Sequence, residues 1–396
     1  MGDAYAPCPV DRLTQEFRLL RLKPESDESL IKCDLQTFSP KTCPPYTALS
    51  YTWGDKRTAV LESIEINGVR FPVRGNLHDF LRQQLDNQNY GPFWIDAVCI
   101  QQSEVHERNH QVQMMRSIYS EARTVLVWLG KESDDSDLAM QMLTTLDPPN
   151  FDGFKNPDKE EGRRELAQQM HKVIMWSIKQ VRSVSSLCKR RYWSRMWIIQ
   201  EIMLAKDIEI QCGSEILEWS KLQHLHHYIK SVSSLSDKEC SPLLKAIISS
   251  PAMTIVSTRW RPIARENLGF LLETCGTHGC EDIRDKLFAL AGVATYGSHI
   301  VIDYSKSAKD VLLDAFYHEM NRMCWENRWG LTSLINLGGM LEKVFQTPFP
   351  ISEIRFHKAR IEVLMPEKLY EADPRPSEQD FFQAIVPPQE VKHGES

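Results

Sequence analysis

Alternating apolar and polar residues near the start of the chain predict two β-hairpins. Residues 16–23 (EFRLLRLK) and 31–38 (IKCDLQTF) alternate between the two classes and flank a turn-like Pro-Glu-Ser-Asp segment. A second hairpin is expected over residues 61–73, because short alternating segments flank Asn67-Gly68, a strong two-residue turn signal. Both segments indicate β-structure in the first part of the chain.

Three mainly apolar runs predict buried strands at residues 46–51 (YTALSY), 93–100 (FWIDAVCI) and 124–129 (TVLVWL). Residues 107–122 carry apolar side chains at helical spacing between the second and third runs. A strand, a helix and a strand of these lengths form a parallel βαβ unit. The pattern therefore predicts an α/β fold with a parallel sheet flanked by helices.

The rest of the chain is predicted to be mostly helical. Residues 192–205 indicate a helix and residues 207–212 a returning strand, whereas residues 131–187 are charge-rich and resemble an insertion. The expected organisation is an α/β core with that insertion, a helical remainder and a partly disordered tail, at residues 1–215, 216–340 and 341–396.

Composition narrows the class of protein. The 396 residues are 42% hydrophobic and 25% charged, which is typical of a soluble globular protein. Lys and Arg number 47 against 53 Asp and Glu, for a net charge of −6, so no basic field attracts nucleic acid or anionic membrane. We therefore expect neither partner. The unusual feature of the composition is its high tryptophan content, ten residues in all.

The sequence also predicts a cytoplasmic protein with reduced thiols. Its first thirty residues contain charges and no continuous apolar region, and no stretch approaches the roughly eighteen apolar residues of a membrane-spanning helix. The ten cysteines are scattered through apolar runs and loops.

Standard catalytic signatures are absent from the sequence: it has no dinucleotide-binding glycine motif, P-loop, H-E-x-x-H or G-x-S-x-G. Cys275, His278 and Cys280 resemble half of a zinc site, but no second Cys/His pair follows. A glycine-containing connecting loop explains these three residues better, and no metal site is predicted.

One carboxylate is aligned with two indoles in the predicted helix 192–205. Trp193, Trp197 and Glu201 recur every four residues and would share a face. A buried acid must either find a donor, such as Arg195, or carry a raised pKa, and acids with raised pKa values are catalytic candidates. The alternative is an exposed glutamate beside core tryptophans.

Asp96 is a second acid in an apolar setting, since it is the one charged residue of the run 93–100. An acid near the carboxyl end of a parallel strand faces the crevice where ligands bind. Alternatively, Asp96 caps the next loop or pairs with a basic residue.

Several blocks in order resemble the fungal heterokaryon incompatibility (HET) domain. They are YTALSYTWGD, INGVRFPVRGNLHDFL, FWIDAVCIQQSEVHERNHQVQMMRSIYSEARTVLVWLG, YWSRMWIIQEIMLA, IRDKLFALAGVA and VIDYS. The resemblance covers roughly residues 16–320. Half of the tryptophans lie in these blocks, at Trp53, Trp94, Trp128, Trp193 and Trp197.

The resemblance implies a fungal protein of self/non-self recognition that triggers regulated cell death. HET domains are thought to be distant relatives of TIR domains, which have a flavodoxin-like parallel sheet and in many cases cleave NAD. TIR enzymes carry a W-x-x-x-E pattern whose Glu is catalytic. Trp197-Ile-Ile-Gln-Glu201 is similar to that pattern, which makes Glu201 the candidate catalytic acid and Trp197 its supporting wall.

By the same resemblance, NAD is the candidate substrate and no cofactor is required. A lone carboxylate can stabilise the oxocarbenium-like state of nicotinamide–ribose cleavage. Aromatic side chains beside it could stack on nicotinamide or adenine. The candidate binding residues at the strand ends and beside the helix are Tyr51, Trp53, Asp55, Asp96, Gln101, Arg195 and Trp197.

Two other functions remain open: a non-catalytic module that signals by assembly, and an enzyme acting on another small molecule. A homo-oligomer or an activating protein partner is compatible with each. The hairpin at 61–73 and the long insertion depart from the TIR pattern. Arg284-Asp285 and Tyr304 have no TIR counterpart, and an ion pair securing the helical part is expected for the first two.

Overall fold

The computed structural model describes residues 3–27, 29–54, 61–148, 171, 173–235, 242–259, 266–295, 297–325 and 331–350. The chain divides into two compact units, Met1–Ala264 and Arg265–Ser396, which are described separately. The domain limits expected at residues 215 and 340 stay predictions. Asp55, residues 149–170 and 172 of the 131–187 insertion, and the tail from 351 lie outside the described residues.

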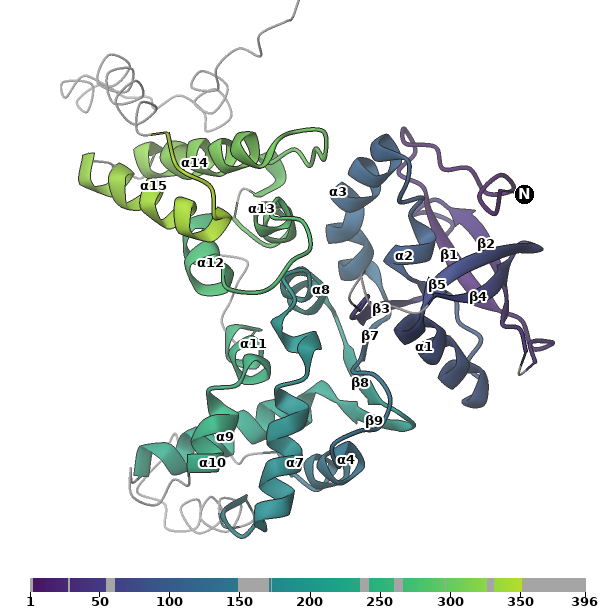
Figure 1. The fold of residues 1–396 in the computed structure, drawn as a ribbon, viewed down its shortest axis with the longest axis horizontal. Coiled ribbons are helices and arrows are strands. Elements are labelled where there is room, and N and C mark those ends of the chain that lie inside the picture. Colours follow the sequence, from purple (N-terminus) through teal and green to yellow (C-terminus); the bar gives the residue numbers. More distant parts are fainter. Residues whose placement is uncertain are drawn as a thin grey trace, which may run out of the picture. The chain divides into compact units, whose positions relative to one another are not determined.

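The first unit contains a nine-stranded mixed sheet (Figure 1). Its spatial order is β5-β4-β2-β1-β6-β3-β7-β8-β9. The strands are β1 (Phe17–Leu22), β2 (Lys32–Phe38), β3 (Thr47–Tyr51), β4 (Leu61–Ile66), β5 (Val69–Arg74), β6 (Phe93–Trp94), β7 (Thr124–Trp128), β8 (Ile208–Cys212) and β9 (Glu215–Glu218).

The centre of this sheet is parallel and flavodoxin-like. β3 pairs in parallel with β6 on one side and β7 on the other, and β7 pairs in parallel with β8. Numbered by chain position, these four strands have the order 2-1-3-4. The order reverses between β3 and β7, and ligands of such sheets bind outside the carboxyl ends of the strands at that point. The predicted α/β class is confirmed.

Both predicted hairpins are present. β1 and β2 are antiparallel, with Phe17 opposite Phe38, and β4 and β5 are antiparallel about a turn at Asn67 and Gly68. These two turn residues have φ values of 53° and 79°, as a two-residue hairpin of this kind requires. Because β4 pairs with β2, the second hairpin extends the sheet edge rather than separating β3 from β7.

Helices cover both faces of the central strands. Phe93 packs on Phe80 of α1, whereas its neighbour Trp94 packs on Tyr119 of α3, so the two helices lie on opposite faces. α8 packs against α3. The helices of the first unit are α1 (Gly75–Asp86), α2 (Asp96–Cys99), α3 (Val105–Glu121), α4 (Ser136–Thr144), α7 (Ile178–Cys188), the 3₁₀ helix η1 (Arg191–Ser194), α8 (Ile198–Leu204), α9 (Trp219–Leu235), α10 (Pro242–Ile248) and α11 (Pro251–Arg259).

The strand predicted over residues 93–100 is wrong after Trp94. The chain turns into α2, whose amides at Val98 and Cys99 donate to the carbonyl of Ile95. A short apolar run is typical of a fully buried strand and also of a fully buried helix, so the apolar pattern alone does not distinguish the two. The turn places Asp96 at the first position of a short helix, directly beyond the end of β6.

The continuous helix predicted over residues 192–205 is also wrong. η1 ends at Ser194, Arg195 is extended with φ −77° and ψ 142°, and α8 begins only at Ile198. The break follows from Trp193, whose indole Nε1 donates to the carbonyl of Leu187 at 3.0 Å and whose ring packs on Trp219. Trp193 thus belongs to the core, and it does not share a helical face with Glu201.

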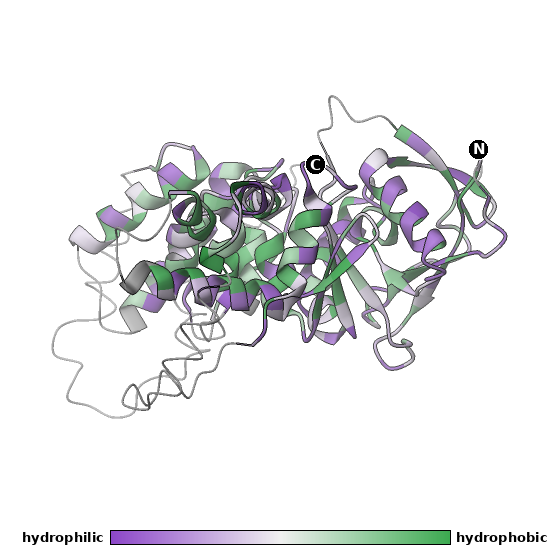
Figure 2. Ribbon diagram, turned by 90° about the horizontal axis from the view of Figure 1, so that it is seen from below, coloured by the Kyte–Doolittle hydropathy of each residue, from purple (hydrophilic) through white to green (hydrophobic). Residues whose placement is uncertain are grey.

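The second unit is helical, as predicted for the C-terminal part. It contains α12 (Leu268–Cys275), α13 (Asp285–Ala291), the 3₁₀ helix η3 (Gly297–His299), α14 (Ala308–Trp325) and α15 (Leu331–Phe345). Among the described helices of both units, none is long and apolar enough to cross a membrane. Figure 2 shows apolar and polar residues mixed along most helices, as expected for helices with one buried face.

Arg284 and Asp285 both secure the helical unit, and the charge of Asp285 acts on Arg284. Arg284 pairs with Asp282 at 2.6 Å and donates to the carbonyl of Tyr304 at 2.5 Å. Asp285 accepts a hydrogen bond from the Tyr304 hydroxyl at 2.7 Å. Side chains of successive residues at the start of a helix point in different directions. Arg284 and Asp285 therefore bind different atoms of Tyr304 and together hold its loop.

Candidate functional site

Glu201 is the buried acid at the centre of the candidate site. It lies in the first turn of α8 with 1% of its surface exposed. The hydroxyl of Ser50, at the carboxyl end of β3, donates a short hydrogen bond to its Oε2. The Tyr192 hydroxyl lies 2.6 Å from Ser50 Oγ. Because Ser50 uses its only proton toward the carboxylate, Tyr192 donates to Ser50, and the three groups form one chain.

Arg195 approaches the same carboxylate from the extended segment before α8. Its Nη1 lies 3.8 Å from Glu201 Oε2, and its side chain is 17% exposed. That distance is an ion pair but not a hydrogen bond, and the buried Nη1 has no hydrogen-bond partner among the described residues. The guanidinium therefore keeps a donor for another group.

Asp96 is the second acid of the site. Trp53, just beyond β3, donates its indole N–H to Asp96 at 3.0 Å from both carboxylate oxygens. The Ala97 amide donates to Asp96 Oδ1 at 2.7 Å, so the carboxylate also accepts from the backbone of α2, although α2 has no side-chain cap. Burial raises the pKa of Asp96, and the positive charge of Arg195 opposes that shift. We call Glu201, Ser50, Tyr192, Arg195, Asp96 and Trp53 the Glu201 cluster.

The electrostatics of the cluster leave Glu201 easy to protonate. Burial raises the pKa of Glu201 from 4.5 to about 7. The charge of Asp96 adds to this rise, whereas Arg195 and the hydrogen bond from Ser50 lower it. A carboxyl group that titrates near neutral pH can hold or release a proton under physiological conditions, which is the property expected of a catalytic acid or base.

The other predicted site residues have different positions. Tyr51 is buried at the end of β3, where burial and then the charge of Asp96 raise the pKa of its hydroxyl. Trp197 precedes α8 and is partly exposed, and its carbonyl accepts from the Glu201 amide at 3.2 Å. Gln101 donates its backbone N–H to Glu107 at 2.7 Å, outside the Glu201 cluster. Asp55 lies outside the described residues.

Sequence reasoning missed Ser50 and Tyr192. The available signal for Ser50 was a polar residue inside the otherwise apolar run 46–51. A buried hydroxyl requires a hydrogen-bond partner, so its presence in a central strand indicates a polar neighbour on the packed helix. That neighbour is 151 residues away in the chain.

Asn76 fixes the loop that carries Trp53. Its side-chain amide donates to the Thr52 carbonyl at 2.6 Å, and its carbonyl oxygen accepts from the Trp128 indole at 3.0 Å. The first residues of α1 thus tie together the ends of β3 and β7, on either side of the switch point.

We expect Asn76→Ala to lower the free energy of unfolding by about 1–3 kcal/mol, because the buried Trp128 N–H loses its acceptor. Urea unfolding measures the change. The control is Asn87→Ala at the exposed end of the same helix, where a change within about 0.5 kcal/mol is expected. Equal effects of the two substitutions would show that Asn76 does not hold the loop.

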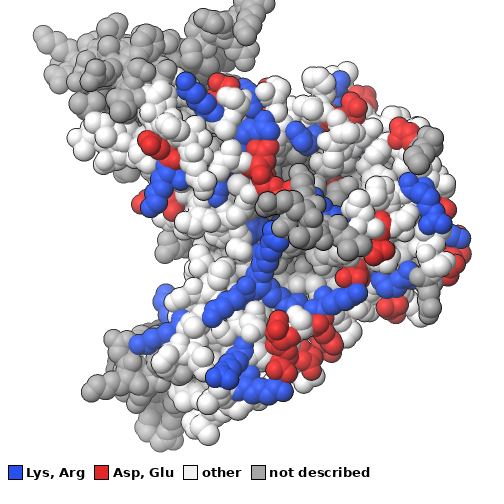
Figure 3. Space-filling view, viewed as in Figure 1, with Lys and Arg blue, Asp and Glu red and all other residues white. Residues whose placement is uncertain are grey.

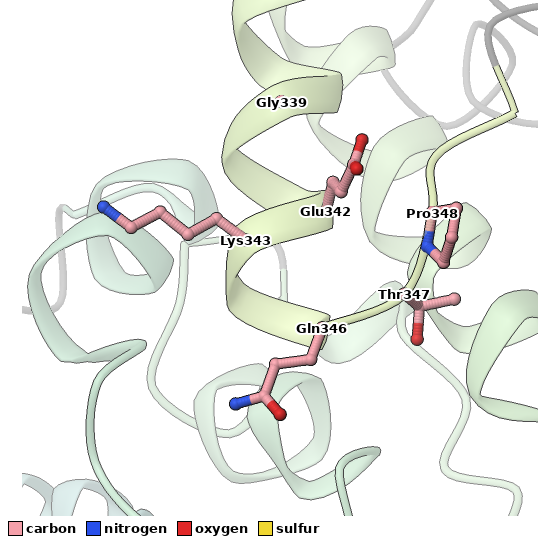
Figure 4. A pocket seen from close by; sticks show the side chains of 6 residues that line it. All are labelled: Gly339, Glu342, Lys343, Gln346, Thr347 and Pro348. Atoms are coloured by element: carbon pink, nitrogen blue, oxygen red, sulfur yellow. The ribbon is translucent and has the colours of Figure 1, made fainter.

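Other features of the described chain are not part of the Glu201 cluster. A shallow hollow at the end of α15 is lined by Gly339, Glu342, Lys343, Gln346, Thr347 and Pro348 (Figure 4) and contains none of the predicted site residues. His278 Nδ1 contacts the carbonyl of Cys275 at 2.9 Å. Within the described ranges, no three His, Cys, Asp or Glu side chains gather as metal ligands. Basic and acidic side chains are interspersed on the face shown in Figure 3.

Comparison with known proteins assigns the region that holds this cluster. The sequence profile of the family described as Heterokaryon incompatibility protein (HET) matches residues 46–201. This chain carries a HET domain. The HET match begins one residue before β3 and ends at Glu201, so it includes every residue of the Glu201 cluster.

A curated relative supports the same assignment. The chain is 28% identical over 358 residues to "Heterokaryon incompatibility protein 6, OR allele" of Neurospora crassa, an alignment that covers 77% of this chain. It covers 51% of the relative, so the chain spans about half the length of that HET protein. No solved structure matches the chain.

Proposed function

We propose that this protein acts in heterokaryon incompatibility, as the name of its curated relative states for that protein, and that its HET domain hydrolyses NAD. The observation that carries the second part is the position of Glu201. It is a buried carboxyl group with a pKa near 7, and it lies beside the carboxyl end of the central strand β3. Ligands of flavodoxin-like sheets bind at that edge.

The chemistry of NAD hydrolysis suits a single carboxylate. Water adds to the anomeric carbon of the nicotinamide ribose, and the carbon–nitrogen bond breaks with its electron pair going to the nicotinamide ring. The products are nicotinamide, ADP-ribose and a proton. Positive charge develops on the ribose, and a carboxylate close to it stabilises the transition state electrostatically.

The contacts of Glu201 suit this role. Ser50 and Arg195 both approach Oε2, so Oε1 is the oxygen that remains for a ribose hydroxyl or for the developing charge. Ionised Glu201 is stabilised by these two groups, and a pKa near 7 leaves a substantial fraction ionised at neutral pH. Trp53, held by Asp96, offers an aromatic face beside the same edge.

The test is incubation of the concentrated, purified full chain with NAD, with nicotinamide read by chromatography. We expect release by the wild type and by Glu209→Gln, an exposed control in β8, but not by Glu201→Gln. Absence of release from wild type, even when it is assembled by cross-linking, would refute NAD hydrolysis. Cell death that persists in Glu201→Gln would instead favour a non-catalytic signalling module.

A further inference from the structure

Arg195 is placed to act on both carboxylates of the Glu201 cluster. It lies in the extended segment between η1 and α8, 3.8 Å from Glu201, and its charge also acts on Asp96. An arginine buried only to complete an ion pair normally forms two parallel hydrogen bonds with its carboxylate. Arg195 does not, since its Nη1 is buried without a hydrogen-bond partner among the described residues.

We propose that Arg195 is a positioning residue of the Glu201 cluster: its guanidinium lies against Glu201 Oε2, favours the ionised form of that carboxylate, and directs Oε1 toward the substrate. This inference rests on the proposed function for the identity of the substrate, but not for the effect of Arg195 on Glu201. Ser50 assists from β3 by donating to the same oxygen.

The other groups around Glu201 do not supply this positive charge. Ser50 of β3, Tyr119 of α3 and Tyr192 of η1 are neutral near pH 7, since burial raises the pKa of each tyrosine well above its ordinary value. Asp96 of α2 is negative when ionised and opposes ionisation of Glu201. Among these groups Arg195 is the cation that attracts Glu201, and without it the carboxyl groups of Glu201 and Asp96 would repel each other unopposed.

The test measures how the free energy of unfolding depends on the ionisation of Glu201, so it does not require enzymatic activity. Each background is compared with the same background carrying Glu201→Gln, which cannot ionise. The difference in free energy of unfolding changes with pH only while the folded and unfolded states bind different numbers of protons at Glu201. Because the pKa is higher in the folded than in the unfolded state, the pH above which this difference becomes constant reports the titration of Glu201 in the folded protein.

We expect Arg195→Met to raise that pH by about one unit or more and Asp96→Asn to lower it, because the two substitutions remove charges of opposite sign. Arg195→Lys keeps the charge and should leave it within about half a unit of wild type. If Arg195→Met does not fold, the double variant Arg195→Met/Asp96→Asn removes both charges, and its comparison with Asp96→Asn isolates the arginine.

An unchanged titration in Arg195→Met, or in the double variant relative to Asp96→Asn, would overturn the proposal. A purely structural Arg195 would lower stability in both members of each pair and leave the titration where it was. Nicotinamide release provides a second readout, since its pH profile should move in the same directions. If wild type does not hydrolyse NAD but the titration moves as stated, the proposed substrate fails and the role of Arg195 stands.

Discussion

Replacing Glu201 by glutamine is expected to lower nicotinamide release about a hundredfold or more while making the folded protein more stable at alkaline pH. The loss of activity follows because glutamine keeps the shape of the side chain and its acceptor for Ser50 but cannot carry the negative charge. Chromatography of nicotinamide under saturating NAD measures the first effect, with Glu209→Gln as the active control.

The gain in stability follows from the direction of the pKa shift. Burial raises the pKa of Glu201 from 4.5 to about 7, so the folded state binds its proton more tightly than the unfolded state. Stability contributed by this group is therefore present below pH 4.5 and is lost as pH rises through about 7. The shift corresponds to about 3 kcal/mol of folding free energy, which the protein loses when Glu201 is ionised. The glutamine variant does not lose it, because glutamine stays neutral.

Thermal unfolding of wild type and Glu201→Gln at about pH 5 and about pH 8 measures this difference. We expect the variant to gain most at the higher pH. Stabilisation on removal of a buried charged group, together with loss of activity, is the trade-off expected of a functional residue. A variant that is less stable than wild type at both pH values would instead assign Glu201 a structural role.

Glu107→Ala is expected to lower the free energy of unfolding by about 3–5 kcal/mol, because it leaves a buried arginine without its counter-ion. Arg18 is 1% exposed and forms two parallel hydrogen bonds with Glu107, at 2.6 and 3.0 Å. It also donates to the Cys99 carbonyl at 3.1 Å, at the end of the short helix that starts with Asp96. The ion pair thus holds the segment that carries one acid of the candidate site.

Urea unfolding measures this effect against Glu121→Ala as a matched control. Glu121 lies on the same helix α3 and pairs with Lys206 at 2.9 Å, but both side chains are more than half exposed. Such surface pairs contribute less than about 1 kcal/mol. Replacing Arg18 and Glu107 together by methionine should recover much of the loss, since no unpaired charge then remains. Equal losses for Glu107→Ala and Glu121→Ala would contradict the assignment.

The elements that sequence patterns predicted correctly are those with local causes. The hairpin of β4 and β5 follows from Asn67 and Gly68, whose positive φ values are available to few residue types. The buried strands β3 and β7 follow from short apolar runs enriched in β-branched and aromatic residues. The spacing of Trp197 and Glu201 also survives in the structure, where they are one helical turn apart.

The failures occurred where packing over long distances overrides local preference. β6 ends at Trp94 because the residues after it turn into α2, although the run 93–100 is as apolar as a strand. Trp193 lies in the core, where it donates to the carbonyl of Leu187 and packs on Trp219. The continuous helix predicted from its spacing with Trp197 is therefore interrupted. Of the three aligned residues, one therefore belongs to the core.

The sequence by itself determined the fold class, the hairpins and the identity of Glu201 as the acid to examine. Only the tertiary structure decided that this acid is buried, that it shares an oxygen with Ser50 and Arg195, and that Asp96 lies near enough to affect its ionisation. Burial and charge pairing depend on side chains that the fold brings together from distant positions, and Ser50 and Glu201 are 151 residues apart. Local patterns carry no information about such a pair.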